Sequence, residues 1–240
     1  MALCRAGLKL WVGEHSTNCI ENAQSREIAV ANSGGSDSTC LLFLLNEYIN
    51  KKLSATKPLQ LLSVTVDHDL QPASVQMAER AAKLAETLGV KHINTKISWG
   101  EGIYPPKPTS HKKLELLARD ARYATLFAAM RDAQANALAL GHHADDQVET
   151  MLMRLGKGTT KLGMVGMKPC SRWGMGSDTY DVMNWRGHEG LHTYKIRPLL
   201  DVGKVHLILI GENLLLTCFF FFTQGTDPCN VRSQEVGICR

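Results

Sequence analysis

The stretch from Glu27 to Ser38 reads EIAVANSGGSDS, and it is the strongest indication of the fold. Its first six residues are mostly apolar and predict a short buried strand. Leucines at helical spacing between residues 38 and 50 predict a helix directly afterwards. Gly34 and Gly35 lie between the two, and they allow a tight turn whose backbone N–H groups can cradle an anion at the helix start. The stretch therefore predicts a strand, a phosphate-binding loop and a helix.

Strand and helix alternate through the rest of the first 155 residues. Further strands are predicted at 60–66, 90–97 and 136–140, and further helices at 72–88, 112–134 and 145–155. Such alternation is typical of parallel sheets, because each helix crosses back over the sheet before the next strand. We therefore expect an α/β protein with a Rossmann-like parallel sheet and helices on both faces. Residues 156–190 are rich in Gly, Lys, Met and Ser and are expected to be irregular.

Polar segments follow three of these strands, at 33–38, 67–69 and 141–150. In parallel sheets ligands bind beyond the carboxyl ends of the strands, so the three segments predict one site. In the first segment, the hydroxyls of Ser33, Ser36 and Ser38 are neutral donors for an oxyanion. Asp37 is a candidate ligand of Mg²⁺. The alternative is a polar turn in which Ser and Asp only cap the helix.

The segment Gly141–Thr150 reads GHHADDQVET and combines two adjacent histidines with three carboxylates. These residue types favour metal or amine binding. On a helix Asp146 and Glu149 share one side, where a pair of carboxylates would bind an ammonium group or Mg²⁺. An acidic helix start stabilised by the helix dipole, with solvated histidines, is the alternative.

Residues 118–123 read ARDARY and place Arg119 and Arg122 three apart on the predicted helix. Two guanidinium groups on one helical side can clamp a phosphate or a carboxylate. A solvated basic face that pairs internally with Asp120 is the alternative.

The composition is that of an ordinary globular protein. The chain has 240 residues, of which 44% are hydrophobic, and a formal net charge of +4. These values exclude a disordered tail and a collagen-like chain. No run reaches the roughly 20 apolar residues that cross a bilayer, so no membrane association is expected. We expect a cytoplasmic protein, with a mitochondrial one as the alternative because residues 1–10 are mildly basic.

Together these segments resemble the N-type ATP pyrophosphatases, or PP-loop superfamily, and within it the tRNA(Ile)-lysidine synthetases. SGGSDS, ARDARY, GHHADDQVET with Arg154, and RPLL at 197–200 stand in that family's order. The resemblance spans roughly residues 27–203, which we take as the PP-loop domain after an extension at 1–26. It implies ATP and Mg²⁺ as cofactors, with an isoleucine tRNA of CAU anticodon and free lysine as partners. The implied reaction adenylates the wobble cytidine, releases pyrophosphate, and then lets lysine displace AMP to form lysidine.

The resemblance also implies roles for single residues. Pyrophosphate would bind at Ser33–Ser38, the metal at Asp37, and the rest of the nucleotide near Asp67 and His68. Asp146 and Glu149 would bind the ammonium groups of lysine, and Arg122 its carboxylate or a phosphate. With Asp37, these three are the predicted catalytic residues. The remaining predicted substrate contacts are Arg119, His142, His143, Asp145 and Arg154.

Residues 204–240 depart from the family pattern. The run LLLTCFFFFTQ at 214–224 stands between RPLL and a family-like DPCN at 227–230. Its residues can be encoded by a pyrimidine-rich tract followed by an acceptor site, so we interpret it as a retained intron; a buried apolar strand is the alternative. Members of the family usually carry further C-terminal domains that bind tRNA, and we expect residues 204–240 not to replace them.

Two other functions remain open at this stage. One is a tRNA thiolase of the same superfamily, although no two of the seven cysteines are spaced C-x-x-C. The other is a truncated remnant that binds nucleotide or RNA without turnover. The sequence leaves the oligomeric state open, with a homodimer as one option.

Overall fold

The structure, a computed structural model, describes residues 27–50, 59–69, 73–101, 104, 106–107, 111–158, 165–173 and 187–209. The extension at 1–26 and the unusual run at 214–224 lie outside the described residues. Five helices are bounded in the described part: α3 (Ser36–Tyr48), α4 (Ala73–Thr87), α5 (His111–Asp132), α6 (Ala144–Gly156) and α7 (Gly187–Leu191). A further helical stretch covers 204–209.

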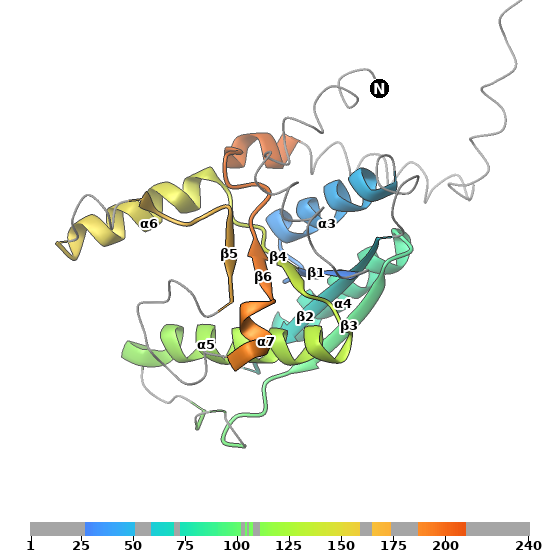
Figure 1. Cartoon of the computed structure of the whole chain (residues 1–240), viewed down its shortest axis with the longest axis horizontal. Coiled ribbons are helices and arrows are strands. Elements are labelled where there is room, and N and C mark those ends of the chain that lie inside the picture. Colours follow the sequence, from blue (N-terminus) through green and yellow to red (C-terminus); the bar gives the residue numbers. More distant parts are fainter. Residues whose placement is uncertain are drawn as a thin grey trace, which may run out of the picture.

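A six-stranded sheet forms the centre of the protein (Figure 1). Its strands are β1 (Glu27–Ala31), β2 (Gln60–Asp67), β3 (Lys91–Lys96), β4 (Ala137–Ala139), β5 (Cys170–Arg172) and β6 (Tyr194–Ile196). They lie in the order β3-β2-β1-β4-β6-β5. Every neighbouring pair is parallel except β5 and β6, which are antiparallel. The predicted α/β class with a Rossmann-like sheet is confirmed.

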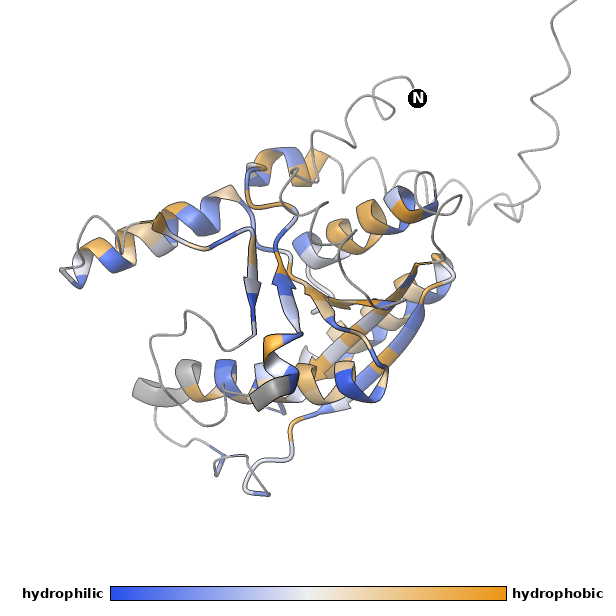
Figure 2. Cartoon of the chain, viewed as in Figure 1, coloured by the Kyte–Doolittle hydropathy of each residue, from blue (hydrophilic) through white to orange (hydrophobic). Residues whose placement is uncertain are grey.

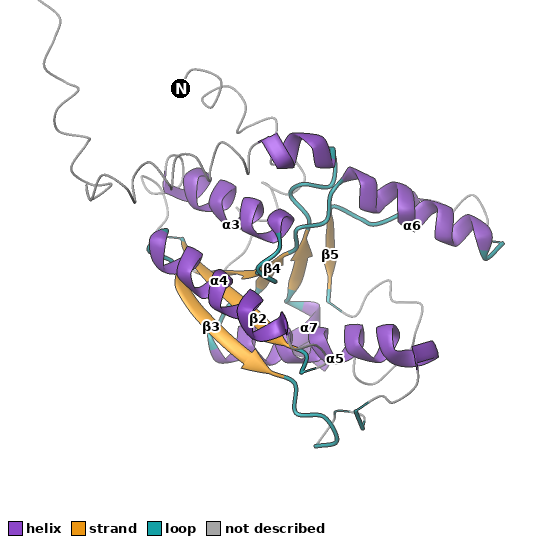
Figure 3. Cartoon of the chain, turned by 180° about the vertical axis from the view of Figure 1, so that it is seen from behind, coloured by secondary structure: helices purple, strands orange, loops and turns teal. Residues whose placement is uncertain are grey.

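Alternating side chains of the central strands feed two separate cores. Ile28 and Val30 of β1 pack with α3 and α4, whereas Ala29 packs with α5 on the other face. β4 follows the same rule, because Ala137 and Ala139 face α3 while Leu138 faces α5. Seen from behind, α4 crosses in front of β2 and β3 (Figure 3). Helices therefore cover both faces of the sheet. Burial of apolar side chains on both faces of the strands stabilises the packing of the helices on the sheet.

The edge beyond β4 corrects the expectation for residues 156–190. Strands β5 and β6 occupy part of this region and the residues after it, and β5 adds an antiparallel edge to a sheet predicted to be parallel. Each strand has only three residues. Segments this short carry no readable alternation of polar and apolar residues, so their pairing depends on tertiary contacts.

Helix α6 extends away from the sheet, and none of its residues is buried (Figure 1). Apolar residues are nevertheless frequent along it (Figure 2). Val148, Met151, Leu152 and Leu155 form one exposed helical stripe. In the described part of the chain, no helix is long and apolar enough to cross a membrane.

Candidate functional site

The strand order places a switch point between β1 and β4. The chain runs outward from β1 through β2 to β3, and then returns to the other side of β1 with β4. A ligand-binding crevice is expected at such a point, at the carboxyl ends of β1 and β4 and between the loops that follow them. A cavity of about 260 Å³ lies here. Its lining includes Asn32, Ser33, Gly35, Asp37, Ser38, His68, Arg122, Tyr123, Gly141, His142 and Asp146.

A second cavity, of about 320 Å³, lies at the amino ends of β4 and β6. Its lining includes Phe127, Asn136 and His192. None of the polar segments predicted to form the site contributes to it. We therefore place the candidate site in the smaller cavity, at the switch point.

The loop after β1 is shaped by glycine and by its own hydroxyls. Gly34 has a φ of +75°, and a Cβ there would clash with the backbone oxygen of Met77 in α4. The Ser33 N–H donates to Ser38 Oγ over 3.2 Å, and Ser38 Oγ lies 3.0 Å from the Gly35 oxygen. These bonds join the loop to the first turn of α3, whose N-terminal N–H groups and dipole favour an anion.

Gly141 brings the loop after β4 against the start of α3. A Cβ at this position would lie 3.2 Å from both the carbonyl carbon of Asp37 and the nitrogen of Ser38. Only a glycine permits this approach without a shift of the backbone. The two motifs, about a hundred residues apart in the sequence, thus share one wall of the cavity.

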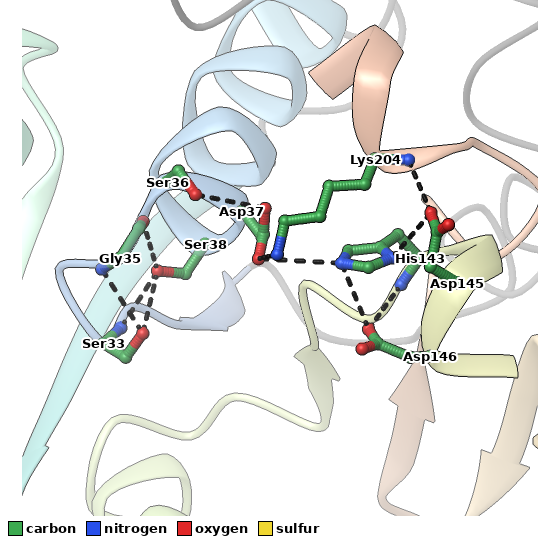
Figure 4. Close-up of polar contacts among 9 residues, drawn as sticks. All are labelled: Ser33, Gly35, Ser36, Asp37, Ser38, His143, Asp145, Asp146 and Lys204. Carbon is green, nitrogen blue, oxygen red and sulfur yellow. Dashed lines mark hydrogen bonds and ion pairs between the residues drawn. The ribbon is translucent and has the colours of Figure 1, made fainter. Parts of the chain in front are cut away.

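His143 is the buried centre of the polar contacts in Figure 4. Its side chain is 4% exposed, and its Nε2 lies 3.7 Å from Oδ2 of Asp37 and 3.7 Å from Oδ2 of Asp146. The His143 backbone N–H donates to the same Asp146 oxygen over 2.9 Å, which caps the start of α6. The structure therefore replaces the alternative of solvated histidines with a buried imidazole between carboxylates.

Lys204 contacts two of the predicted site residues, Asp37 and Asp145, which the sequence did not indicate. Its Nζ lies 3.9 Å from Asp37 Oδ2, and its backbone N–H donates to Asp145 Oδ2 over 2.7 Å (Figure 4). No pattern around residue 204 distinguishes this lysine from other surface lysines, because the contact exists only once the chain after β6 has returned to α3.

A cationic group borders the cavity on the α5 side. Arg119 and Arg122 lie 5.7 and 5.8 Å from the ring centroid of Tyr123, and Lys195 of β6 lies 5.7 Å from it. Lys195 also lies 5.4 Å from the ring of Trp173. Burial, followed by repulsion from Arg197 and Arg119, lowers the pKa of Lys195 to about 8. Such a concentration of positive charge favours an anionic ligand.

Burial also keeps the two cavity histidines neutral. It lowers the pKa of His142 to about 4, with repulsion from Arg197 as the next cause and attraction to Asp146 opposing it. Burial and the charge of Arg122 lower the pKa of His68. Two neutral imidazoles at neutral pH can donate or accept hydrogen bonds without adding charge.

The predicted site residues divide into two groups. Those that line the cavity are Ser33, Gly35, Asp37, Ser38, His68, Arg122, His142 and Asp146. The others lie outside the lining: Gly34 and Ser36 belong to the same loop, His143 is buried against Asp37 and Asp146, Asp67 accepts from the Asp69 N–H, and Asp145 faces Lys204. Arg119 and Glu149 are exposed, and Arg154 donates to the Gly166 oxygen over 3.0 Å.

The composition of the site is consistent with one divalent cation bound mainly through a nucleotide. Mg²⁺ commonly uses one or two protein carboxylates together with phosphate oxygens and water. Asp37 stands at the phosphate loop with its side chain 30% exposed, so its oxygens are accessible. Among the described residues, no group of three His, Cys, Asp or Glu side chains could hold a metal ion by itself.

Comparison with known proteins agrees with this geometry. A family profile described as a PP-loop domain matches residues 11–216. The chain belongs to the PP-loop family. In sequence, this PP-loop protein is 38% identical over 150 residues to tRNA(Ile)-lysidine synthases of Brucella ovis and Brucella canis. This similarity confirms the resemblance inferred from the motifs.

The matched region is 62% of this chain and 31% of each Brucella relative. The chain therefore spans about a third of the length of the curated relatives that it matches.

Solved structures share the fold at low sequence identity. A U34-tRNA thiolase from Methanococcus maripaludis, solved with its [4Fe-4S] cluster, has a TM-score of 0.62 at 19% identity, over 89% of this chain and 63% of that one. An NH3-dependent NAD synthetase from Campylobacter jejuni has a TM-score of 0.53 at 13% identity, over 89% and 74%. These likenesses support the fold of the PP-loop protein and leave its substrate open.

Proposed function

We propose that this PP-loop protein is an ATP-dependent tRNA-modifying ligase that forms lysidine in an isoleucine tRNA. The observation that carries the proposal is the switch-point cavity, where the loop after β1 meets the segment Gly141–Asp146. The similarity to the Brucella tRNA(Ile)-lysidine synthases supports the choice of substrates. Because the chain spans only part of those relatives, its activity, tRNA and lysine are all parts of the proposal.

The first step would join the C2 oxygen of the wobble cytidine to the α-phosphorus of ATP and release pyrophosphate. The loop Ser33–Ser38 would bind the phosphates through backbone N–H groups and hydroxyls, with the α3 dipole favouring their charge. Asp37 would hold Mg²⁺, which neutralises charge on the phosphates when bound. Catalysis at this step would be mostly positioning and electrostatic stabilisation.

The second step would form a bond between the lysine amine and C2 of the cytidine, and break the C2–O bond so that AMP leaves with the oxygen. Asp146 lines the cavity and would bind an ammonium group, with Glu149 one turn further along α6. Arg122 would bind the carboxylate of lysine or a phosphate, supported by the neighbouring Arg119. The remaining predicted contacts would orient the tRNA or the lysine.

The test uses the full chain with Mg²⁺, ATP, lysine and a tRNA transcript of CAU anticodon. We expect pyrophosphate release that requires the tRNA, repeated turnover that also requires lysine, and a nucleoside whose mass corresponds to cytidine plus lysine minus water. A transcript with a UAU anticodon and the variant Asp37→Asn serve as matched controls. ATP binding without tRNA-dependent pyrophosphate release would contradict the ligase and favour a binding remnant.

The same test can also detect thiolation, which the similarity in fold to a tRNA thiolase raises as a second candidate function. That likeness, at 19% identity, concerns the fold alone. A sulfur-containing nucleoside, formed only with an added sulfur donor, would reject lysidine formation in favour of thiolation. A lysine adduct would reject thiolation.

A further inference from the structure

Asn32 places a polar amide in the core, directly after β1 and before the phosphate loop. It is 1% exposed. Its backbone joins β2, because its N–H donates to the Val64 oxygen over 2.9 Å and its own oxygen accepts from Thr65 Oγ1 over 2.6 Å. These bonds fix the backbone of Asn32 and so the point from which its side chain starts. Because the amide is buried, any of its polar atoms without a hydrogen bond would lower the stability of the fold.

The side-chain oxygen of Asn32 faces the loop. Oδ1 accepts from the Gly34 N–H over 3.1 Å and lies 3.3 Å from Ser38 Oγ. A backbone N–H can only donate, so the atom that faces Gly34 must be the oxygen. Ser38 has a single hydroxyl hydrogen, which Asn32 Oδ1 and the Gly35 oxygen share. The Gly34 bond thus identifies which end of the amide is the oxygen.

The amide nitrogen of Asn32 then faces the core of the sheet. It donates to Ser63 Oγ over 3.2 Å, and Ser63 is fully buried on β2. Ser63 Oγ in turn lies 3.0 Å from Nδ1 of His92 on β3. The serine oxygen accepts from Asn32 and keeps its own hydrogen and a second lone pair for a hydrogen bond with His92 Nδ1.

We propose that Asn32 is a positioning residue for the phosphate loop, oriented from within the sheet by Ser63 and His92. The inference rests on the proposed nucleotide site and deepens it. Because the Gly34 N–H is bonded to Asn32, that N–H points back into the protein and does not itself bind phosphate. The amide holds the left-handed turn at Gly34, so that the N–H groups after it converge on the ligand before the ligand arrives.

The experiment compares ligands with and without phosphate. Asn32→Leu removes every side-chain hydrogen bond of Asn32 at similar volume, and Ser63→Ala removes the hydroxyl that joins the Asn32 amide nitrogen to His92. We expect the Kd for Mg-ATP to rise about tenfold in Asn32→Leu and about threefold in Ser63→Ala. The Kd for adenosine should stay within about twofold in both, because the loop contacts only phosphate. Isothermal titration calorimetry gives both constants.

Thr193→Val is the matched control. Thr193 is buried, donates its hydroxyl to the Glu189 oxygen over 2.9 Å, and lies at the amino end of β6, away from the loop. Its removal should leave both constants unchanged. Equal weakening of Mg-ATP and adenosine in the Asn32 and Ser63 variants would overturn the proposal, because a general loss of structure affects both ligands. Unchanged Mg-ATP binding in both variants would overturn it as well.

Amide hydrogen exchange separates this inference from the proposed function. If the wild-type chain does not bind Mg-ATP, the proposed function fails, but the loop can still be tested without nucleotide. Asn32→Leu should then speed exchange of the Gly34 amide at least tenfold while amides of β1 keep their protection. An unchanged Gly34 rate would overturn the positioning role. If Asn32→Leu does not fold, Ser63→Ala decides each comparison by itself.

Discussion

The Nε2 atom of His143 lies 3.7 Å from Oδ2 of Asp37, across the switch point of the sheet. This contact joins the residue that starts α6 to the one in the first turn of α3. It exists because Gly141 lets the two backbones approach closely. The predicted metal-binding carboxylate is therefore held against a buried imidazole and is not a free surface group.

Asp37→Asn tests the carboxylate itself. We expect tRNA-dependent pyrophosphate release to fall at least a hundredfold, because the amide keeps the shape and loses the charge that would hold Mg²⁺. The measurement is a coupled pyrophosphate assay at saturating ATP. Asp132→Asn, an exposed carboxylate paired with Arg131, is the matched control and should leave the rate unchanged. Equal rates in the two variants would show that Asp37 does not act in the reaction.

Asp146 has two separable roles, and two substitutions distinguish them. Asp146→Asn keeps an oxygen for the His143 N–H and loses the charge, so lysine binding should weaken while thermal stability stays near the wild type. Asp146→Ala loses both, and should also lower the free energy of unfolding by about 1 kcal/mol. Calorimetric melting and lysine titration provide the measurements. Unchanged lysine affinity in Asp146→Asn would remove this residue from the amine site.

Gly34→Ala tests the geometry of the loop. In Gly34→Ala the new residue must adopt a positive φ, and its Cβ clashes with the Met77 backbone. Gly100→Ala also places alanine at a positive φ, of +79°, but its Cβ has no atom within 4 Å. We expect Gly100→Ala to cost about 1 kcal/mol and Gly34→Ala at least about 2 kcal/mol more, as measured by urea unfolding. Similar losses in both variants would mean that α4 moves aside at little cost.

Lys195 predicts a pH dependence of stability. Its pKa is lowered to about 8 in the folded protein from its ordinary value of 10.5, so between these values the unfolded chain binds more protons. The free energy of unfolding should therefore rise with pH from about 8 to 10.5 in the wild type relative to Lys195→Met. Urea unfolding at a series of pH values measures the difference, in which groups common to both chains cancel. A flat difference would contradict the buried cationic group.

Local sequence patterns were sufficient to predict the central strand-loop-helix unit and the class of the fold. Residues 27–38 combine an apolar strand with two glycines and a helix start, and these local preferences agree with the final structure. Alternation of strands and helices sufficed to predict a parallel sheet, because each crossover has few alternatives. The similarity to tRNA(Ile)-lysidine synthetases could also be inferred from the sequence, because each of the motifs that carry it is an unbroken stretch of residues.

Which of the predicted site residues lie close together depends on the packing of distant segments. Asp146 and Glu149 share a helical side by spacing, yet Asp146 lines the cavity while Glu149 is exposed. Lys195 and Lys204 reach the site only because β6 pairs beside β4 and the following chain returns to α3. The amide of Asn32 depends in the same way on Ser63 and His92, which lie on neighbouring strands. Contacts between distant segments follow from packing and strand order, and no local pattern of residues encodes them.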